Sequence, residues 1–216
     1  MDVFRLVPRM CMEKVKAIKR LPPQFFNRDP RRVSRDLLGK VLVRRHGREL
    51  LAGRIVEVEA YLGTGDPAAH AAAGRTVRND VLFGPPGHAY VYFIYGNHYC
   101  LNVSCLPDGV PGCVLIRALE PVGGIEEMAH ARGVSLHRAA DLRKLSSGPG
   151  RLAEALHITR ERDNGKNLTS ADSDLWIADD GYRVRRVLIT KRVGIRKAAE
   201  MRLRYVIAGN EFVSRE

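Results

Sequence analysis

The chain has 216 residues, 45% of them hydrophobic, which is the size and composition of one soluble globular domain. Lysine and arginine number 36 against 24 acidic residues, and this net charge of +12 favours a polyanionic partner, nucleic acid before an anionic membrane. A surface tuned for solubility would show the same excess. No apolar run is long enough to span a bilayer, and the N-terminus lacks the features of a cleaved signal peptide.

Residues 1–20 are predicted to form a loosely ordered basic arm, and residues 21–216 a single domain. The four cysteines are Cys11, Cys100, Cys105 and Cys113. Their spacing matches no zinc or iron–sulfur pattern, so we expect small apolar core residues. Because nothing demands a disulfide, we expect a cytoplasmic protein.

The first elements follow from local signals. Asp29 and Pro30 supply a carboxylate N-cap and a proline at the first helical position, and Gly39 ends the predicted helix. Residues 40–45 and residues 49–61 are then predicted to be strands.

The strand over residues 49–61 carries an unusual face. Alternation places on one side Val56, Val58 and Ala60. The other side holds Ile55, Glu57, Glu59 and Tyr61. Two carboxylates and a tyrosine are unusual if that side is core, whereas glutamates facing solvent on a half-buried strand are the ordinary alternative. This pattern alone favours the ordinary alternative.

His70 follows a second helix start signal, Asp66 and Pro67, so we predict a short helical turn with His70 near its N-terminus. The helix dipole at such a position favours a neutral imidazole. An isolated histidine is more often a surface or core residue, but the neighbouring carboxylates and tyrosines make a functional role equally plausible.

Three arginines are predicted to contact phosphate groups. Arg75 and Arg78 lie in the basic, glycine-started loop of residues 74–79. Arg151 follows a glycine-bearing turn where a helix is predicted to begin near Pro149, and free amide groups at a helix start favour an anion.

Residues 88–95 alternate as a strand and are followed by a two-residue hairpin turn of Gly96 and Asn97. Tyr95 is therefore predicted at the hairpin tip, where an aromatic side chain buries little surface within its own domain. That is the geometry of a wedge that enters a partner. A tyrosine that packs across the hairpin is the alternative.

Residues 112–121 form an apolar strand pattern interrupted by Arg117. A nearly buried guanidinium needs an acceptor, and Glu59 is the candidate. The alternative is an arginine at a strand edge.

The remaining segments mix helices and strands. Helices are predicted within residues 123–133, over 137–146 and from about Pro149. Strands are predicted within residues 174–180, 182–195, 203–209 and 211–215. Because the strands are mostly adjacent and linked by hairpins, with the helices gathered after them, the fold class is α+β.

Together these features describe an enzyme that acts on a flipped base. Aromatic side chains hold a flat ring by stacking, a carboxylate beside them activates water, and the basic surface binds the nucleic acid.

Six segments resemble the alkyladenine (3-methyladenine) DNA glycosylase family, in order along the chain: RIVEVEAYLG, AAHAAAGRTVRN, HAYVYFIYGNHYCLNV, VLIRALEP, SGPGRL and KRVGI. The resemblance covers the chain from about Leu21 to its end, and several linked motifs are more specific than one. It implies a single mixed α+β domain, with a curved antiparallel β core that carries a protruding β-hairpin and is surrounded by helices.

The resemblance implies a monofunctional DNA glycosylase of base excision repair. Such an enzyme flips alkylated or deaminated purines out of duplex DNA, hydrolyses the N-glycosidic bond with a Glu-activated water and leaves an abasic site. The implied partner is double-stranded DNA with damaged purines, and neither a cofactor nor a metal is implied. We expect a monomer that is associated with the nucleoid through DNA binding.

The resemblance also assigns catalytic residues. Glu59 matches the general base that activates the water, and Arg117 matches the arginine that helps to hold that carboxylate and the water. Val193 matches a residue whose backbone carbonyl contacts the water.

The base pocket and the wedge are assigned in the same way. Tyr61, His70 and Tyr92 match the residues that sandwich and contact the flipped base. Asn102 matches the residue that rejects guanine by a clash with its exocyclic amino group, and Tyr95 matches the side chain inserted into the duplex.

Two other functions compete with this interpretation. A non-catalytic DNA-lesion-binding protein would need the basic face and the wedge but neither Glu59 nor Arg117. A metal-dependent hydrolase would use Glu57, Glu59 and His70, but the chain shows no second histidine at a recognisable ligand spacing.

Overall fold

The structure, a computed structural model, describes residues 18–94, 96 and 98–214. Its strands are β1 (Lys19–Arg20), β2 (Val41–His46), β3 (Glu49–Tyr61), β4 (Ala89–Ile94), β5 (His98–Ser104), β6 (Cys113–Gly123), β7 (Leu175–Asp179), β8 (Val187–Thr190) and β9 (Arg204–Ile207). Its α-helices are α2 (Pro23–Phe26), α3 (Pro30–Leu37), α4 (Ile125–Ala131), α5 (Arg143–Ser146), α6 (Pro149–Ala155) and α7 (Arg160–Asp163). Short 3-10 turns cover Gly63–Gly65, Asp80–Phe83 and Ala139–Leu142.

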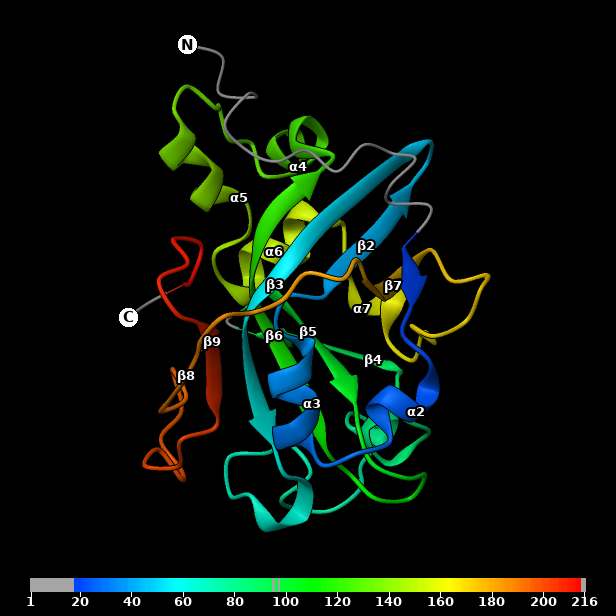
Figure 1. The fold of residues 1–216 in the computed structure, drawn as a ribbon. Coiled ribbons are helices and arrows are strands. Elements are labelled where there is room, and N and C mark those ends of the chain that lie inside the picture. The colour runs from blue at the N-terminus through cyan, green and yellow to red at the C-terminus, as the bar shows by residue number, and fades with distance from the viewer. Residues whose placement is uncertain (1–17, 95, 97, 215–216) are drawn as a thin grey trace.

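The described strands form one antiparallel sheet in the order β1-β7-β2-β3-β6-β5-β4, and β9 adds to β3 and β8 to β9. The long strand β3 is its centre. One edge of β3 pairs first with β2 and then with β9, and the other edge pairs with β6, so the sheet curls around it (Figure 1). The predicted α+β class, a single mixed domain with a curved antiparallel β core, is confirmed.

Helices cover both faces of this sheet (Figure 1). The helix α3 packs against β3 and β6 through Val33 and Leu37, which are fully buried. The helix α6 packs against β5 and β6 with Leu152 on its buried side. The start of α3 is capped as predicted, because Asp29 Oδ1 accepts a hydrogen bond from the N–H of Arg31 at 2.8 Å.

The pairing of β3 with β6 is irregular on both sides of Glu57. Ile55 pairs with Leu119, Glu57 with Ala118 and Val58 with Ile116, so the register passes over Val56 on one strand and Arg117 on the other. Such bulges re-aim side chains next to active sites. The result is that Glu57 and Glu59 are buried together with the apolar side of β3 rather than exposed to solvent.

Two predicted elements are absent. Residues 67–73 form a series of turns and not a helical turn. The carboxylate of Asp66 accepts hydrogen bonds from the N–H groups of Leu62 and Ala68 and is held by Arg192. Residues 211–214 do not pair as a strand, since the segment folds onto the sheet instead and the N–H of Ser214 donates to Glu57.

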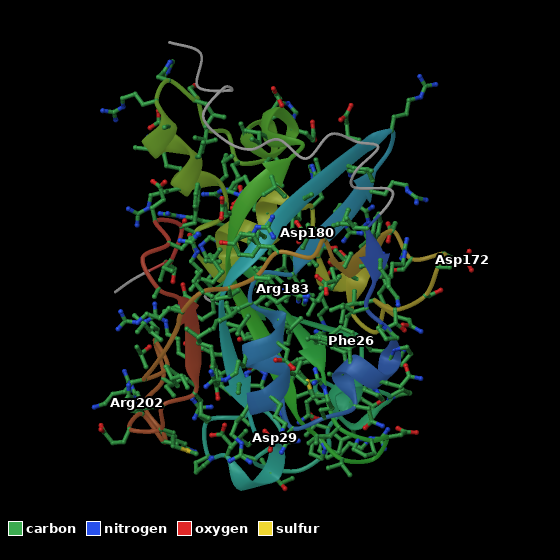
Figure 2. The ribbon with its side chains drawn as sticks, in the orientation of Figure 1. Phe26, Asp29, Asp172, Asp180, Arg183 and Arg202 are labelled. Atoms are coloured by element: carbon green, nitrogen blue, oxygen red, sulfur yellow. The ribbon has the colours of Figure 1, made fainter. Side chains whose placement is uncertain are left out.

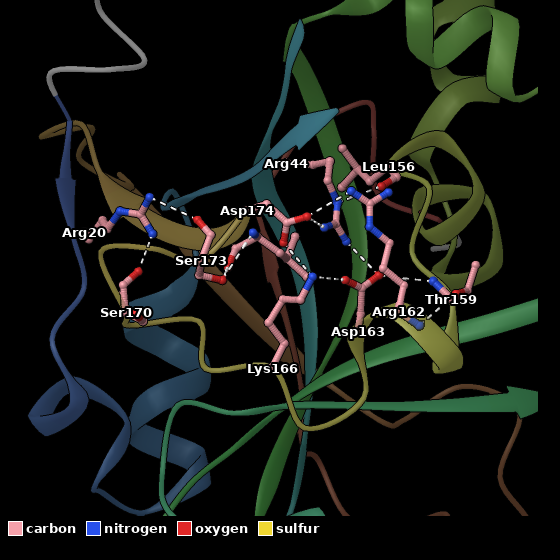
Figure 3. A network of polar contacts seen from close by, with 11 residues as sticks. Arg20, Arg44, Leu156, Thr159, Arg162, Asp163, Lys166, Ser170, Ser173 and Asp174 are labelled. Atoms are coloured by element: carbon pink, nitrogen blue, oxygen red, sulfur yellow. Dashed lines mark hydrogen bonds and ion pairs between the residues drawn. The ribbon is translucent and has the colours of Figure 1, made fainter. Parts of the chain in front are cut away.

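Ion pairs of the buried Arg44 join β2 to α7 and to the start of β7 (Figure 3). Arg44 of β2 is fully buried, lies 2.7 Å from Asp163 and 3.1 Å from Asp174, and donates from Nε to the carbonyl of Leu156. Lys166 contacts both aspartates. Removing one member of such a buried network would leave an uncompensated charge, so the network fixes β2, β7 and the end of α6 in one arrangement.

The chain after β7 crosses in front of β2 and β3 on its way to β8 (Figure 1). Asp180, labelled in Figure 2, receives two hydrogen bonds from Arg54 of β3, and the ring of Tyr182 lies 4.1 Å from the same guanidinium. This crossing segment leads to the strand pair β8–β9 that borders the candidate site.

Several other sequence-based expectations concern the described part of the chain. Cys100, Cys105 and Cys113 are buried free thiols, as expected, while Cys11 lies outside the described residues. Lys19 and Arg20, which were assigned to the N-terminal arm, pair with β7. No helix among the described residues is long and apolar enough to cross a bilayer.

Candidate active site

A cleft of about 440 Å³ opens where β3, the β4–β5 hairpin and β6 meet the start of α6. Its lining residues are Tyr61, Tyr92, Ile94, His98, Cys100, Leu115, Arg117, Ser147, Gly148, Pro149, Gly150, Arg151, Val193, Gly194, Ile195 and Ser214. A Cβ at Gly150 would lie 2.8 Å from the ring of His98, so glycine allows α6 to begin against the hairpin.

Glu59 lies directly beneath this cleft and is fully buried. Its Oε1 accepts a hydrogen bond from the backbone N–H of Val193 at 2.7 Å, and its Oε2 accepts one from the hydroxyl of Tyr61 at 2.9 Å. Nη1 of Arg117 lies 3.4 Å from Oε1. All three partners line the cleft, so one layer of side chains separates the carboxylate from it.

Glu57 has a more strongly bonded environment. Its Oε1 accepts hydrogen bonds from Nε of Arg117 and from Nε of Arg204, both at 2.8 Å. Ser214 donates to the same carboxylate through its N–H at 2.7 Å and its hydroxyl at 3.0 Å. Arg117 therefore bridges the two glutamates, and its shorter contact is with Glu57 rather than with the predicted Glu59.

The pKa values of the two glutamates are shifted in opposite directions. Burial acts to raise the pKa of Glu57, but the charge of Arg117 and the hydrogen bonds outweigh it, and the pKa lies below the usual range. Burial raises the pKa of Glu59 above its usual range, because Arg117 and the two hydrogen bonds only partly oppose it and the charge of Glu57 adds to it. A carboxyl whose pKa is moved towards neutrality suits a general base.

A second buried ion pair supports this arrangement. Arg192 and Asp66 are both fully buried in their side chains, and Nη2 of Arg192 donates to Asp66 Oδ1 at 2.9 Å. Nη1 of Arg192 also donates to the carbonyl of Ala60, and its guanidinium lies 4.7 Å from the ring of Tyr61. The pair thus ties the segment that carries Val193 to the end of β3.

Tyrosines and His70 form the wall beside the cleft. Nδ1 of His70 lies 2.8 Å from the hydroxyl of Tyr90, and its ring contacts that of Tyr92 edge-on with centroids 4.5 Å apart. Burial lowers the pKa of His70, and the charge of Arg78 adds to this effect. The lowered pKa favours the neutral imidazole, and the cause is burial and the charge of Arg78 rather than the predicted helix dipole.

Asn102 is placed behind this wall. It is buried, and its Nδ2 donates to the carbonyl of Tyr90 at 3.2 Å while its Oδ1 accepts from the thiol of Cys113. It does not line the cleft in this structure. Its role against guanine remains a prediction.

The predicted DNA-contact residues lie on exposed surface. Arg151 is at the mouth of the cleft, whereas Arg75 and Arg78 belong to the exposed loop next to His70. Arg75 is paired with Asp80 at 2.6 Å. Tyr95 lies outside the described residues, although the hairpin that carries it is paired as far as Ile94 and His98.

Several residues of the site were not identified from the sequence. Glu57 was considered only as a neighbour of Glu59 and as a ligand in the metal-dependent alternative, and Asp66 only as a helix start signal. Arg204, Ser214 and Arg192 were not assigned roles. Three of these five lie far from Glu59 along the chain, so no local spacing connects them with it. The alternation of β3 was a usable signal for Glu57, because it placed both carboxylates on one face.

The chain is similar in sequence to known proteins. The sequence profile of the family described as methylpurine-DNA glycosylase (MPG) matches residues 24–211. The chain belongs to this family. Members are N-glycosyl hydrolases with a DNA substrate, so the chain is an enzyme of DNA repair and not a non-catalytic lesion-binding protein.

Individual relatives extend over most of the chain. A protein of Koribacter versatilis is 64% identical over 194 residues, which cover 90% of this chain and 92% of the relative. Proteins of Burkholderia cenocepacia and Methanoculleus marisnigri are each 47% identical, cover 90% of this chain, and are themselves covered to 90% and 98%. All three carry the provisional name 3-methyladenine DNA glycosylase.

Proposed function

We propose that this glycosylase flips alkylated and deaminated purines out of duplex DNA and hydrolyses their N-glycosidic bond with a water activated by Glu59. The observation that carries the proposal is the position of Glu59. Its carboxylate is buried with a raised pKa, and its partners Tyr61, Arg117 and Val193 line the cleft that lies above it.

The base would occupy the aromatic side of the cleft. Tyr61 and Tyr92 line it, and His70 packs edge-on against Tyr92, so a flat ring has stacking surfaces on the way to Glu59. Electron-rich tyrosine rings favour a cationic ring over a neutral one, which favours alkylated purines. Because unstacking costs least at damaged pairs, flipping adds selectivity.

Glu59 would act twice in the reaction. As the general base it takes a proton from the water that attacks C1′ of the sugar. As an anion it stabilises the positive charge that develops on the sugar when the base leaves. Arg117 and the N–H of Val193 favour the charged form of the carboxylate and hold it in a fixed orientation. The oxygen of the water bonds to C1′ as the bond to the base breaks, and an abasic site remains in the DNA.

The cleft favours hydrolysis over lyase chemistry. Among the described residues that line it there is no lysine, so a Schiff base with the sugar has no nucleophile there. A metal-dependent route through Glu57 is also disfavoured, because Arg117 and Arg204 already bind that carboxylate with positive charge.

We propose that Arg75, Arg78 and Arg151 contact the DNA backbone around the cleft and that Tyr95 enters the gap left by the flipped base. The exposed positions of the three arginines and the paired β4–β5 hairpin support this arrangement. One wedge at one lesion requires one copy, so we expect the enzyme to act as a monomer.

The test is base release under single-turnover conditions with EDTA present. Duplex oligonucleotides carry one 3-methyladenine, ethenoadenine or hypoxanthine, and alkali converts abasic sites to breaks. We expect Glu59→Gln to lower the rate by roughly 100-fold or more while DNA binding persists. Glu49→Gln, at the exposed start of the same strand, is the matched control and should keep the full rate.

The outcomes separate the parts of the proposal. Full activity of Glu59→Gln would reject the assigned base. Excision of 3-methyladenine without hypoxanthine would keep the mechanism and reject the deaminated substrates. Loss of wild-type activity in EDTA would reject the metal-free reaction.

A further inference from the structure

A second cluster of titratable side chains lies away from the cleft. His46 ends β2, Glu127 lies in the first turn of α4, and His157 follows α6. Each presents one possible ligand atom, and these three atoms lie within 4.8 Å of one another. None of the three residues lines the cleft.

The three side chains are in direct contact and only partly exposed. The imidazole rings of His46 and His157 stack with centroids 3.9 Å apart and 7° between their planes. Nε2 of His157 lies 3.0 Å from Oε1 of Glu127. Two imidazoles and a carboxylate are a donor set that suits a divalent transition metal such as zinc.

The backbone around the cluster is firmly anchored. Arg44, two residues before His46 on β2, is buried and donates to the carbonyl of Leu156, the residue next to His157 (Figure 3). His157 has a φ of 50°, in the left-handed region, and its N–H donates to the carbonyl of Glu154. The end of β2 and the end of α6 are therefore held together before any ligand arrives.

Charged side chains surround the cluster. The guanidinium groups of Arg162 and Arg44 act on His46 through their positive charge. The two arginines are themselves paired with Asp163 and Asp174. Glu127 also faces His130, whose Nδ1 lies 3.9 Å from the carboxylate on exposed surface.

We propose that His46, Glu127 and His157 form a binding site for Zn²⁺ or a chemically similar divalent transition metal. Tetrahedral zinc with ligand bonds of about 2.1 Å holds its donor atoms roughly 3.4 Å apart. The Glu127–His157 pair, at 3.0 Å, is a few tenths of an ångström closer than this spacing. The ring of His46 must turn out of the stack to aim a nitrogen at the same point, and a water completes the fourth position.

An ion at this site would have a structural role, since it would hold three elements together rather than take part in catalysis. The metal would join the tip of the β2–β3 hairpin, α4 and the end of α6, whose arrangement is visible in Figure 1. Because the ion binds only where the three segments are assembled, it would stabilise the folded chain. The ligands come from positions 46, 127 and 157, so sequence spacing alone gives no sign of them.

The test uses the full chain without an affinity tag, freed of metal by a chelator. Zn²⁺ is titrated in competition with a chromophoric chelator, and Co²⁺ is added separately to look for the absorption bands of a tetrahedral site. We expect one Zn²⁺ per chain, a tetrahedral Co²⁺ spectrum and a rise of several degrees in the melting temperature.

The variants distinguish a built site from surface histidines. His46→Asn and His157→Asn should each weaken Zn²⁺ binding by roughly tenfold or more and abolish the rise in Tm, and asparagine tolerates the left-handed backbone at position 157. His130→Asn is the matched control and should bind as the wild type does. Absence of stoichiometric binding, or equal loss in the His130 variant, would overturn the proposal.

Discussion

Glu57 accepts hydrogen bonds from two arginines and from Ser214, whereas Glu59, two residues further along β3, is bonded by a backbone N–H and a tyrosine hydroxyl. Both carboxylates are fully buried. The cations depress the pKa of the first, and burial raises the pKa of the second. The same residue type on one strand thus serves as an anchor in one place and as a candidate base in the other.

The difference shows how the site is built. Glu57 neutralises Arg117 and Arg204 and so orients Arg117, which then reaches Glu59 with its second nitrogen at 3.4 Å. Glu59 keeps an incompletely compensated charge next to the cleft. A fully paired carboxylate would be a poor base, so the weaker bonding of Glu59 is consistent with its proposed function.

The largest expected effect on stability comes from Glu57→Gln. This change leaves Arg117 and Arg204 buried with less compensation and should lower the free energy of unfolding by about 3 kcal/mol at neutral pH. Glu59→Gln is the isosteric control, and urea denaturation of both variants provides the measurement. Equal losses in the two variants would remove the distinction between them.

The pH dependence of these stabilities has opposite signs. The pKa of Glu57 is lower in the folded protein than in the unfolded chain, so its ion pairs stabilise above about pH 4.3, and this contribution is lost as the pH falls through the folded value. The pKa of Glu59 is higher when folded, so its charge costs stability as the pH rises. We predict that Glu59→Gln is as stable as the wild type or more stable at pH 8.

Arg117→Gln should change the pH profile of base release. Removing the guanidinium raises the pKa of Glu59 further, so a larger fraction of the carboxyl is protonated and inactive at mildly acidic pH. We expect the acid limb of kcat/KM to move to higher pH, with a greater loss at pH 5.5 than at pH 8. A uniform loss at all pH values would mean that Arg117 does not act through Glu59.

Tyr61→Phe should also move the acid limb of kcat/KM to higher pH, but by less than Arg117→Gln does. The phenylalanine ring keeps the stacking surface but removes the hydroxyl that donates to Oε2 of Glu59 at 2.9 Å. A single neutral donor contributes less than a neighbouring cation, so we expect a smaller displacement and a rate loss of roughly tenfold at most. A shift larger than that of Arg117→Gln would reverse the assigned order of the two groups.

Arg192→Lys should have the smallest effect. Lysine retains the charge opposite Asp66 but cannot reproduce the two-pronged contact or the packing over Tyr61. We expect a rise in KM of roughly two- to fivefold with little change in kcat, because a loosened wall weakens binding more than chemistry. If the acid limb of kcat/KM moved as far as it does in Arg117→Gln, Arg192 would also influence the pKa of Glu59.

Much of the sheet could be predicted because its signals are local. Alternation over residues 49–61 gave the bounds of β3, and the Asp29–Pro30 start and Gly39 end located α3 to within two residues. Asp66 and Pro67 gave the same helix signal and no helix formed. There the carboxylate of Asp66 accepts from the N–H of Ala68 but is also bound by the buried Arg192, a contact that no local rule reveals.

The site was predictable only in part for the same reason. Family motifs directed attention to Glu59, Arg117 and Val193, and the structure brings all three together. The contacts that separate Glu57 from Glu59 come from residues 204 and 214, and they depend on a bulge that turns Arg117 inward. The alternation along β3 places both glutamates on the same face, so their different environments could be recognised only from the tertiary structure.

The most direct measurement is a carbon-detected NMR titration of the glutamate side-chain carboxyls in the DNA-free enzyme. The resonances of Glu57 and Glu59 are assigned by their loss in the two Gln variants. We predict that Glu59 titrates above the usual range of a glutamate and Glu57 below it. A lower pKa for Glu59 than for Glu57, or two ordinary values, would contradict the division of roles between them.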